Sequence, residues 1–268
     1  MKRIGSLEEL NRIVQKPDYK KVGNWMARNV TRDMALPLTR LFLHTPITAN
    51  QVTFLSFVSA LAGCAFLALG GKVGVLVGAF LIQLWYLLDH VDGQVARYRN
   101  QSSLTGIYFD YVIHYVVHAG IFFGIGAGVY LKTGNAIYMA VGGAAGTAVI
   151  LLNLVYDVQY KAFFHRIVKA EHIRIKSDKG EKGTGSSSEG DIIRKGFSYL
   201  HKICEVHVVM NLITLLAIIG LFTGVRIWEY FMLFYMFVTV FTAVVKNTYF
   251  VFFRVPDTTF DAEIEVIR

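Results

Sequence analysis

The residues with the clearest potential for chemistry lie between positions 89 and 114. They read D-H-V-D-G-Q-V-A-R, then eight residues, then G-I-Y-F-D-Y-V-I-H. The acidic residues of this stretch accompany two otherwise apolar segments, 74–88 and 108–131. Because a carboxylate is energetically unfavourable in hydrocarbon, ionisable residues in such segments indicate a functional site.

Helical spacing predicts where these side chains point. Asp89 and Asp92 are three residues apart and share one helix face with Gly93, whereas Asp110 and His114 form one stripe on the next helix. A short turn between the helices would make them antiparallel neighbours, so that three carboxylates converge. Mg²⁺ is typically bound by carboxylates together with substrate phosphates, and two ions ~4 Å apart would clamp a phosphoryl group.

This spacing resembles the signature of the CDP-alcohol phosphotransferase family, D-x-x-D-G-x-x-A-R, eight residues, G-x-x-x-D-x-x-x-D. The matching positions are Asp89, Asp92, Gly93, Ala96, Arg97, Gly106 and Asp110. His114 stands where the family has its fourth aspartate. Residues 48–53, T-A-N-Q-V-T, are also similar to the T-P-N-x-x-T sequence of that family, with Ala49 in place of the proline.

The resemblance implies ligands for a metal and for a nucleotide. It implies that Asp89, Asp92 and Asp110 hold Mg²⁺ or Mn²⁺, as a two-ion site. The residues implied to contact the nucleotide and its phosphates are Asn50, Gly93, Ala96, Arg97 and Gly106. Simpler explanations stay open for two of them, because Asn50 or Thr48 could cap a helix and Arg97 could anchor a helix end at the cytoplasmic side.

His114 is the informative departure from the signature. By resemblance the fourth position is a metal ligand or the general base that accepts the proton of the attacking alcohol, and a neutral imidazole can do either. We favour the base. The alternative is a packing histidine in a family member with lost or altered activity. His118, one turn further along, either orients His114 or packs, and His90 lies off the acidic face and is interpreted as structural.

The elements that must position these residues are membrane helices. The chain of 268 residues is 54% hydrophobic, with a mean hydropathy of +0.46, which is typical of a membrane protein. Apolar windows of ~20 residues predict six transmembrane helices near 47–69, 73–97, 103–131, 136–163, 206–223 and 227–253. Gly70-Gly71, Thr133-Gly134 and Gly224 mark the tight turns. The predicted fold is all-α and integral to the membrane.

The basic residues predict the orientation. Of 27 Lys and Arg residues, only Lys72, Lys132 and Arg226 fall in the turns opposite the motif. The positive-inside rule therefore places both termini and the site on the cytoplasmic side of the cell's inner (cytoplasmic) membrane.

The remaining segments predict the domain organisation. Residues 1–46 are basic and interrupted by Pro17 and Pro37, and we expect an amphipathic helix on an anionic membrane surface. The alternative is a solvated helix packed on the enzyme. Helices 1–4 with the motif span 47–165, and helices 5–6 span 206–254. Between them, 166–205 is expected to be a flexible cytoplasmic loop, Gly/Ser-rich over 173–192, and 255–268 a cytoplasmic tail.

Candidates for binding the acceptor carry no diagnostic spacing. They are Lys246 near the end of the last span, Tyr156 at the end of the fourth, and Arg166 beyond it. Lys246 would bind an acceptor phosphate or head group, or would simply extend its ammonium to the membrane surface.

The resemblance implies a metal-dependent CDP-alcohol phosphotransferase of phospholipid biosynthesis. A hydroxyl acceptor would attack the β-phosphate of a CDP-linked donor, such as CDP-diacylglycerol, and release CMP. Other interpretations are a catalytically altered member that binds the donor, or an ion or proton transporter. Acids clustered at one end of two helices argue against transport. The expected partners include the bilayer and no nucleic acid, and a homodimer is suggested by the family alone.

Overall fold

The computed structural model describes residues 5–16, 18–169, 172–175, 199–222 and 227–267. The chain begins with α1 (Leu7–Val14), the π-helix η1 (Ala27–Thr31) and α2 (Arg32–Leu43). Four long helices follow, α3 (Ala49–Leu69), α4 (Lys72–Arg99), α5 (Leu104–Thr133) and α6 (Ile137–Val168). The C-terminal half contains β1 (His172–Ile175), α8 (Val206–Phe222), α9 (Ile227–Phe252), α10 (Val255–Glu263) and β2 (Ile264–Ile267).

The predicted all-α membrane fold is confirmed, with one short strand pair, β1–β2, beside the helices. Within the described residues, α3, α4, α5, α6 and α9 are long and apolar enough to cross a membrane. The predicted fifth span corresponds to α8, which is apolar but has only 17 residues. The structure thus supports five spans by length and composition, and the predicted number of six is not confirmed.

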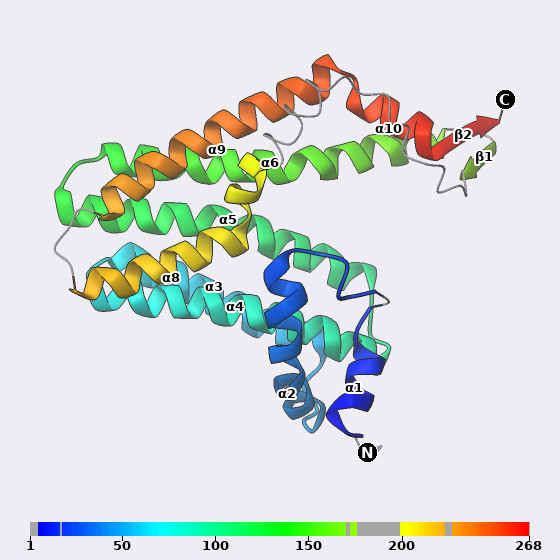
Figure 1. Cartoon of the computed structure of the whole chain (residues 1–268), viewed down its shortest axis with the longest axis horizontal. Helices are drawn as coiled ribbons and strands as arrows, with labels where there is room; N and C mark the ends of the chain where they lie inside the picture. Colours follow the sequence, from blue (N-terminus) through cyan, green and yellow to red (C-terminus); the bar gives the residue numbers. More distant parts are fainter. Residues whose placement is uncertain (1–4, 17, 170–171, 176–198, 223–226, 268) are drawn as a thin grey trace.

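Two of the three predicted turns, Gly70-Gly71 and Thr133-Gly134, lie where the sequence predicts them, and Gly224 lies outside the described residues. Thr48 caps α3 in a capping box with Gln51, and α3 ends at Gly70, whose φ of 67° favours glycine. Asn100 ends α4 in the left-handed region, so α5 starts only a few residues later. In Figure 1, α1, β2 and the α4–α5 turn lie toward the right of the view, and the α3–α4 turn lies toward the left.

Helix packing rests on small residues. α3 packs against α4 and α5, α6 against α5 and α9, and α8 against α4. A Cβ at Gly124 would lie 2.6 Å from the Cys64 carbonyl oxygen, and one at Gly128 would lie 2.4 Å from that of Leu67. Glycine therefore lets the backbones of α5 and α3 approach closely, as in other membrane helix pairs.

The N-terminal segment contains a helix that runs through Pro37, where the sequence suggested an interruption. Pro37 lies inside α2 and does not break it, because the removal of one backbone hydrogen bond is offset by the buried residues Ala35, Leu36 and Thr39. α1 and α2 pack on α4, with Leu10 and Val14 almost fully buried. Trp25, Met34 and Leu41 of the same segment stay exposed, so both interpretations, a helix on the membrane surface and a solvated helix packed on the enzyme, stay predictions.

The expected loop over 166–205 is partly structured. α6 extends to Val168, residues 199–204 are helical, and β1 pairs antiparallel with β2 of the tail. Residues 176–192 of the Gly/Ser-rich stretch lie outside the described residues. The tail is anchored by Phe260 of α10, which is 2% exposed and contacts the ring of Phe163.

Candidate functional site

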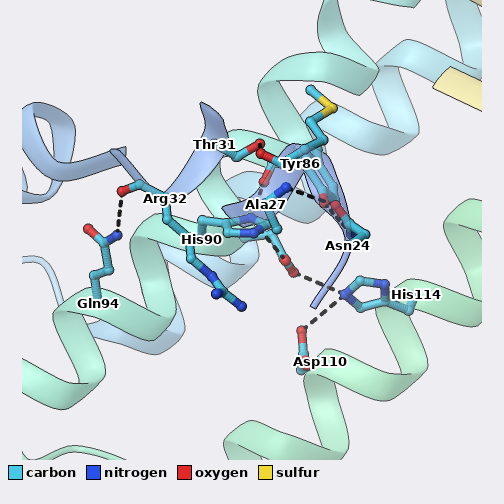
Figure 2. Close-up of polar contacts among 11 residues, drawn as sticks. Asn24, Ala27, Thr31, Arg32, Tyr86, His90, Gln94, Asp110 and His114 are labelled. Carbon is cyan, nitrogen blue, oxygen red and sulfur yellow. Dashed lines mark hydrogen bonds and ion pairs between the residues drawn. The ribbon is translucent and has the colours of Figure 1, made fainter. Parts of the chain in front are cut away.

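The two motif helices bring Asp89, Asp110 and His114 together. His114 Nε2 of α5 lies 3.1 Å from Asp89 Oδ1 of α4 and 3.5 Å from Asp110 Oδ1 of its own helix, and Figure 2 shows the imidazole facing Asp110. One ligand atom from each of the three lies within 4.8 Å of the others, a grouping that could hold a metal ion. The spacing argument thus places two of the predicted metal aspartates beside the residue that departs from the signature.

An aromatic cluster fixes the His114 ring. The buried Trp85 ring lies 5.4 Å from it between centroids, and the His118 ring lies 5.5 Å away at 90°. His118 Nδ1 is 2.7 Å from Asn153 Nδ2 of α6, so His118 faces a different helix through this nitrogen. His118 therefore contacts His114 through ring packing, and its bond to Asn153 fixes the orientation of that packing.

A cavity of about 550 Å³ opens beside these residues, and we call it the motif cavity. It lies between the start of α3, the second half of α4, the start of α5 and the N-terminal segment. The lining includes all three predicted metal aspartates and all five predicted nucleotide residues: Asp89, Asp92, Asp110, Asn50, Gly93, Ala96, Arg97 and Gly106. Asp92 lines the cavity but is not part of the close group around His114.

Small residues in the cavity wall leave room for polar side chains. A Cβ at Gly93 would lie 3.3 Å from Arg97 Nη1, and one at Gly106 would lie 3.4 Å from Asn50 Oδ1. Thr48 provides the cap of α3, so Asn50 is free of that task and lines the cavity. Capping is thus the role of Thr48, and a nucleotide contact by Asn50 stays a prediction.

The predicted acceptor residues lie elsewhere. In the part of the chain that the structure describes, none of Lys246, Tyr156 and Arg166 lines the motif cavity. Lys246 Nζ lies 4.1 Å above the Tyr156 ring and 3.3 Å from Nδ1 of His201. Burial and the charge of Lys246 lower the pKa of His201 to about 4, so this ring is neutral and can accept a hydrogen bond from the ammonium.

Arg166 has a different set of partners. Its guanidinium lies 3.7 Å from carboxylate oxygens of both Asp257 and Asp261, and 4.5 Å above the Phe260 ring. Arg166 thus ties the end of α6 to α10, and its ligand-binding role remains a sequence prediction.

The sequence reasoning missed the contribution of the N-terminal segment to the cavity. Gln15, Lys16, Tyr19 and Arg32 all line it, as does His90, whose Nδ1 lies 2.9 Å from the Tyr86 carbonyl oxygen. A signal for α1 was available, because Ser6 and Glu9 form a capping box ahead of apolar residues at positions 7, 10 and 14.

Sequence comparison with known proteins relates the region that contains this site to a protein family. Residues 46–177 match the sequence model of the CDP-alcohol phosphatidyltransferase family. One relative, named a bifunctional IPC transferase and DIPP synthase, from Rubrobacter xylanophilus, is 36% identical over 85 residues, 32% of this chain and 19% of the relative. A protein of the same name from Aquifex aeolicus is 29% identical over 108 residues, 40% of this chain and 24% of the relative.

The aligned region thus spans no more than about a quarter of either curated relative. The family match covers the whole of α3, α4, α5 and α6, together with β1. Residues 46–177 of this chain therefore belong to the CDP-alcohol phosphatidyltransferase family.

Proposed function

We propose that this protein is a metal-dependent membrane transferase that moves a phosphatidyl or phospho-alcohol group from a CDP-linked donor to a hydroxyl acceptor, with release of CMP. The observation that carries the proposal is the close approach of Asp89, Asp110 and His114 in a matched family domain. Both aspartates line the motif cavity, and His114 contacts both of them without lining the cavity itself. The product fits phospholipid biosynthesis.

The possible ligand atoms in and next to the motif cavity suit a divalent cation. Asp89 and Asp110 offer hard oxygen ligands, Asp92 lines the same space, and His114 adds one nitrogen. We propose Mg²⁺ or Mn²⁺, with room for two ions. When bound, such ions would neutralise phosphate charge and polarise the transferred phosphoryl group.

His114 is proposed as the general base. In the neutral tautomer that carries its proton on Nδ1, the Nε2 lone pair accepts the proton of the acceptor hydroxyl as the oxygen forms a bond to the donor's β-phosphorus. The bond from that phosphorus to the bridging oxygen breaks, and CMP leaves with the electron pair. Asp89, 3.1 Å from Nε2, would stabilise the protonated imidazolium.

The nucleotide is proposed to lie along Asn50, Gly93, Ala96, Arg97 and Gly106. Arg97 offers its remaining N–H groups to a phosphate, since its Nε already donates to the Val14 carbonyl. Gly93 and Gly106 leave the wall without side chains at the points where Arg97 and Asn50 approach.

The acceptor is proposed to engage Lys246 and Tyr156, with Arg166 as a further candidate. The stacked Lys246–Tyr156 pair provides an ammonium beside an aromatic face, a combination that suits a phosphorylated or hydroxylated acceptor. We place the site and both termini on the cytoplasmic side of the inner membrane, in agreement with the distribution of basic residues.

A test follows CMP release by the purified full chain in detergent. CDP-diacylglycerol and water-soluble CDP-alcohols would be supplied separately with Mg²⁺ or Mn²⁺, with and without candidate hydroxyl acceptors. CMP formation that requires both metal and acceptor is expected. Metal-dependent nucleotide binding without CMP from any donor would instead identify a catalytically altered binding protein, the interpretation that His114 motivates.

A further inference from the structure

Hydrogen bonds from motif side chains of α4 to backbone carbonyl oxygens attach the N-terminal segment to the motif, and further hydrogen bonds hold the segment together. Arg97 Nε donates to the Val14 carbonyl oxygen, and Arg32 Nη1 donates to those of Tyr19 and Val22. Gln94, inside the motif, donates from Nε2 to the Arg32 carbonyl oxygen at 2.9 Å, as Figure 2 shows. The segment therefore has a defined position relative to α4.

Apolar packing fixes the same segment. Leu10 is 1% exposed and Val14 is fully buried, and both belong to one cluster with Val91 and Val95 of α4. Val91 and Val95 alternate along α4 with the motif residues that line the cavity. Side chains that follow Val14 are consequently held at the edge of the motif cavity.

The side chains that follow Val14 form a polar wall of the motif cavity. Gln15, Lys16 and Tyr19 line the motif cavity opposite the motif helices, together with Arg32. The Gln15 Nε2 atom is buried and has no hydrogen-bond partner among the described residues. Lys16 is exposed, and Tyr19 is half-buried with its hydroxyl 3.1 Å from Asn11 Nδ2.

The charges of the cavity balance. Lys16, Arg32 and Arg97 supply three cationic groups that line the same space as the three motif aspartates. A ligand that combines divalent cations with phosphates can engage both sets, the cations at the carboxylates and the phosphates at the basic groups.

Gln15, Lys16 and Tyr19 come before α3, the first apolar helix, in the chain. We therefore expect them to contact the water-soluble part of a donor and not its hydrocarbon. An amide, an aromatic ring and an ammonium together suit a base and a phosphate, because the amide can donate to ring nitrogen or carbonyl acceptors and the ammonium pairs with phosphate oxygens. An acyl chain would leave all three polar groups desolvated without partners.

We propose that Gln15, Lys16 and Tyr19 form the nucleotide-recognition wall of the site, with Gln15 donating to the pyrimidine base and Lys16 pairing with a phosphate. This inference rests on the proposed function and extends the donor site beyond the matched domain, into a segment that the family match does not cover.

The test measures equilibrium binding of CMP, and of ribose 5-phosphate as a ligand without a base, to the purified full chain with Mn²⁺. Gln15→Met keeps the length of the side chain and removes the amide, so it should weaken CMP about 3- to 10-fold and leave ribose 5-phosphate unchanged. Lys16→Met should weaken both ligands by a similar factor. Lys21→Met is the matched control, because Lys21 lies in the same segment, pairs with Asp18 at 3.1 Å and does not line the cavity.

The outcomes separate this inference from the proposed function. Variants that bind CMP as the wild type does would overturn the recognition wall and leave the proposed function standing. Equal loss of both ligands in Gln15→Met would overturn the base contact. A wild-type protein that binds no CMP with any divalent metal would overturn the proposed function, and the recognition wall with it.

Discussion

Replacement of His114 by alanine tests the role of the residue that departs from the family signature. Its Nε2 lies 3.1 Å from Asp89 and 3.5 Å from Asp110, so the imidazole is positioned at the acids and not in the lipid-facing surface. A positioned general base contributes about 10²- to 10⁴-fold to the rate of a step. At about 1.4 kcal/mol per tenfold, His114→Ala should raise the barrier by roughly 3 to 5 kcal/mol.

Nucleotide binding should respond much less. Asp89, Asp92 and Asp110 all remain in the motif cavity of the variant, so CMP binding with Mn²⁺ should weaken by less than about tenfold. The assay pairs kcat for CMP release with the dissociation constant for CMP. His165→Ala is the matched control, because His165 is an exposed histidine near the end of α6 and outside the cavity lining.

Two results would refute the reasoning. Wild-type kcat in His114→Ala would exclude the base. A loss of CMP binding as large as the loss of kcat would show that His114 acts mainly as a metal ligand. His114→Asp, which restores the family's fourth carboxylate, should keep substantial activity and shift metal preference toward Mg²⁺, since Mg²⁺ favours oxygen over nitrogen ligands.

Three further predictions concern the scaffold. Gly142→Ala should lower the unfolding free energy by about 1 to 3 kcal/mol, because its Cβ would lie 2.7 Å from the Phe122 carbonyl oxygen. The neighbouring Gly143→Ala, with 3.5 Å to a ring atom, should be neutral or stabilising in the same thermal melts. Phe260→Ala should release α10, seen as faster proteolysis of the tail, and an unaltered cleavage rate would contradict this anchor. The pKa of His201 is lowered to about 4, so the unfolded chain binds more protons between pH 4 and 6.5, and stability should fall as pH drops through that window. A His201→Gln variant should flatten this slope, and an identical slope in both proteins would reject the assignment.

The spans and the acidic cluster could be predicted from sequence because both depend on local periodicity. Apolar windows and glycine turns set the helix limits, and spacing of three and four residues placed Asp89, Asp110 and His114 on facing helices. The signature spacing also gave the cavity lining around Gly93 and Gly106.

The contribution of the N-terminal segment could not be predicted in the same way. Its place beside α4 depends on contacts between residues about 80 positions apart in the sequence, such as Arg97 with Val14. The partners of Arg166 likewise come from α10, distant in sequence, and no periodic pattern marks such pairs. The sequence shows that Arg97 and Arg166 are basic, but it does not show which carboxylate or carbonyl oxygen each one binds.

The account depends most on a divalent metal held by the motif acids, and direct Mn²⁺ binding tests it. Electron paramagnetic resonance of free Mn²⁺ would be followed during titration of the wild type, Asp89→Asn and Asp110→Asn. Asp157→Asn is the control, because that α6 carboxylate accepts a hydrogen bond from Tyr115 and lies outside the cavity lining. We predict that both motif variants weaken Mn²⁺ binding at least tenfold while the control binds as the wild type does. Equal Mn²⁺ affinity in all four proteins would contradict the account.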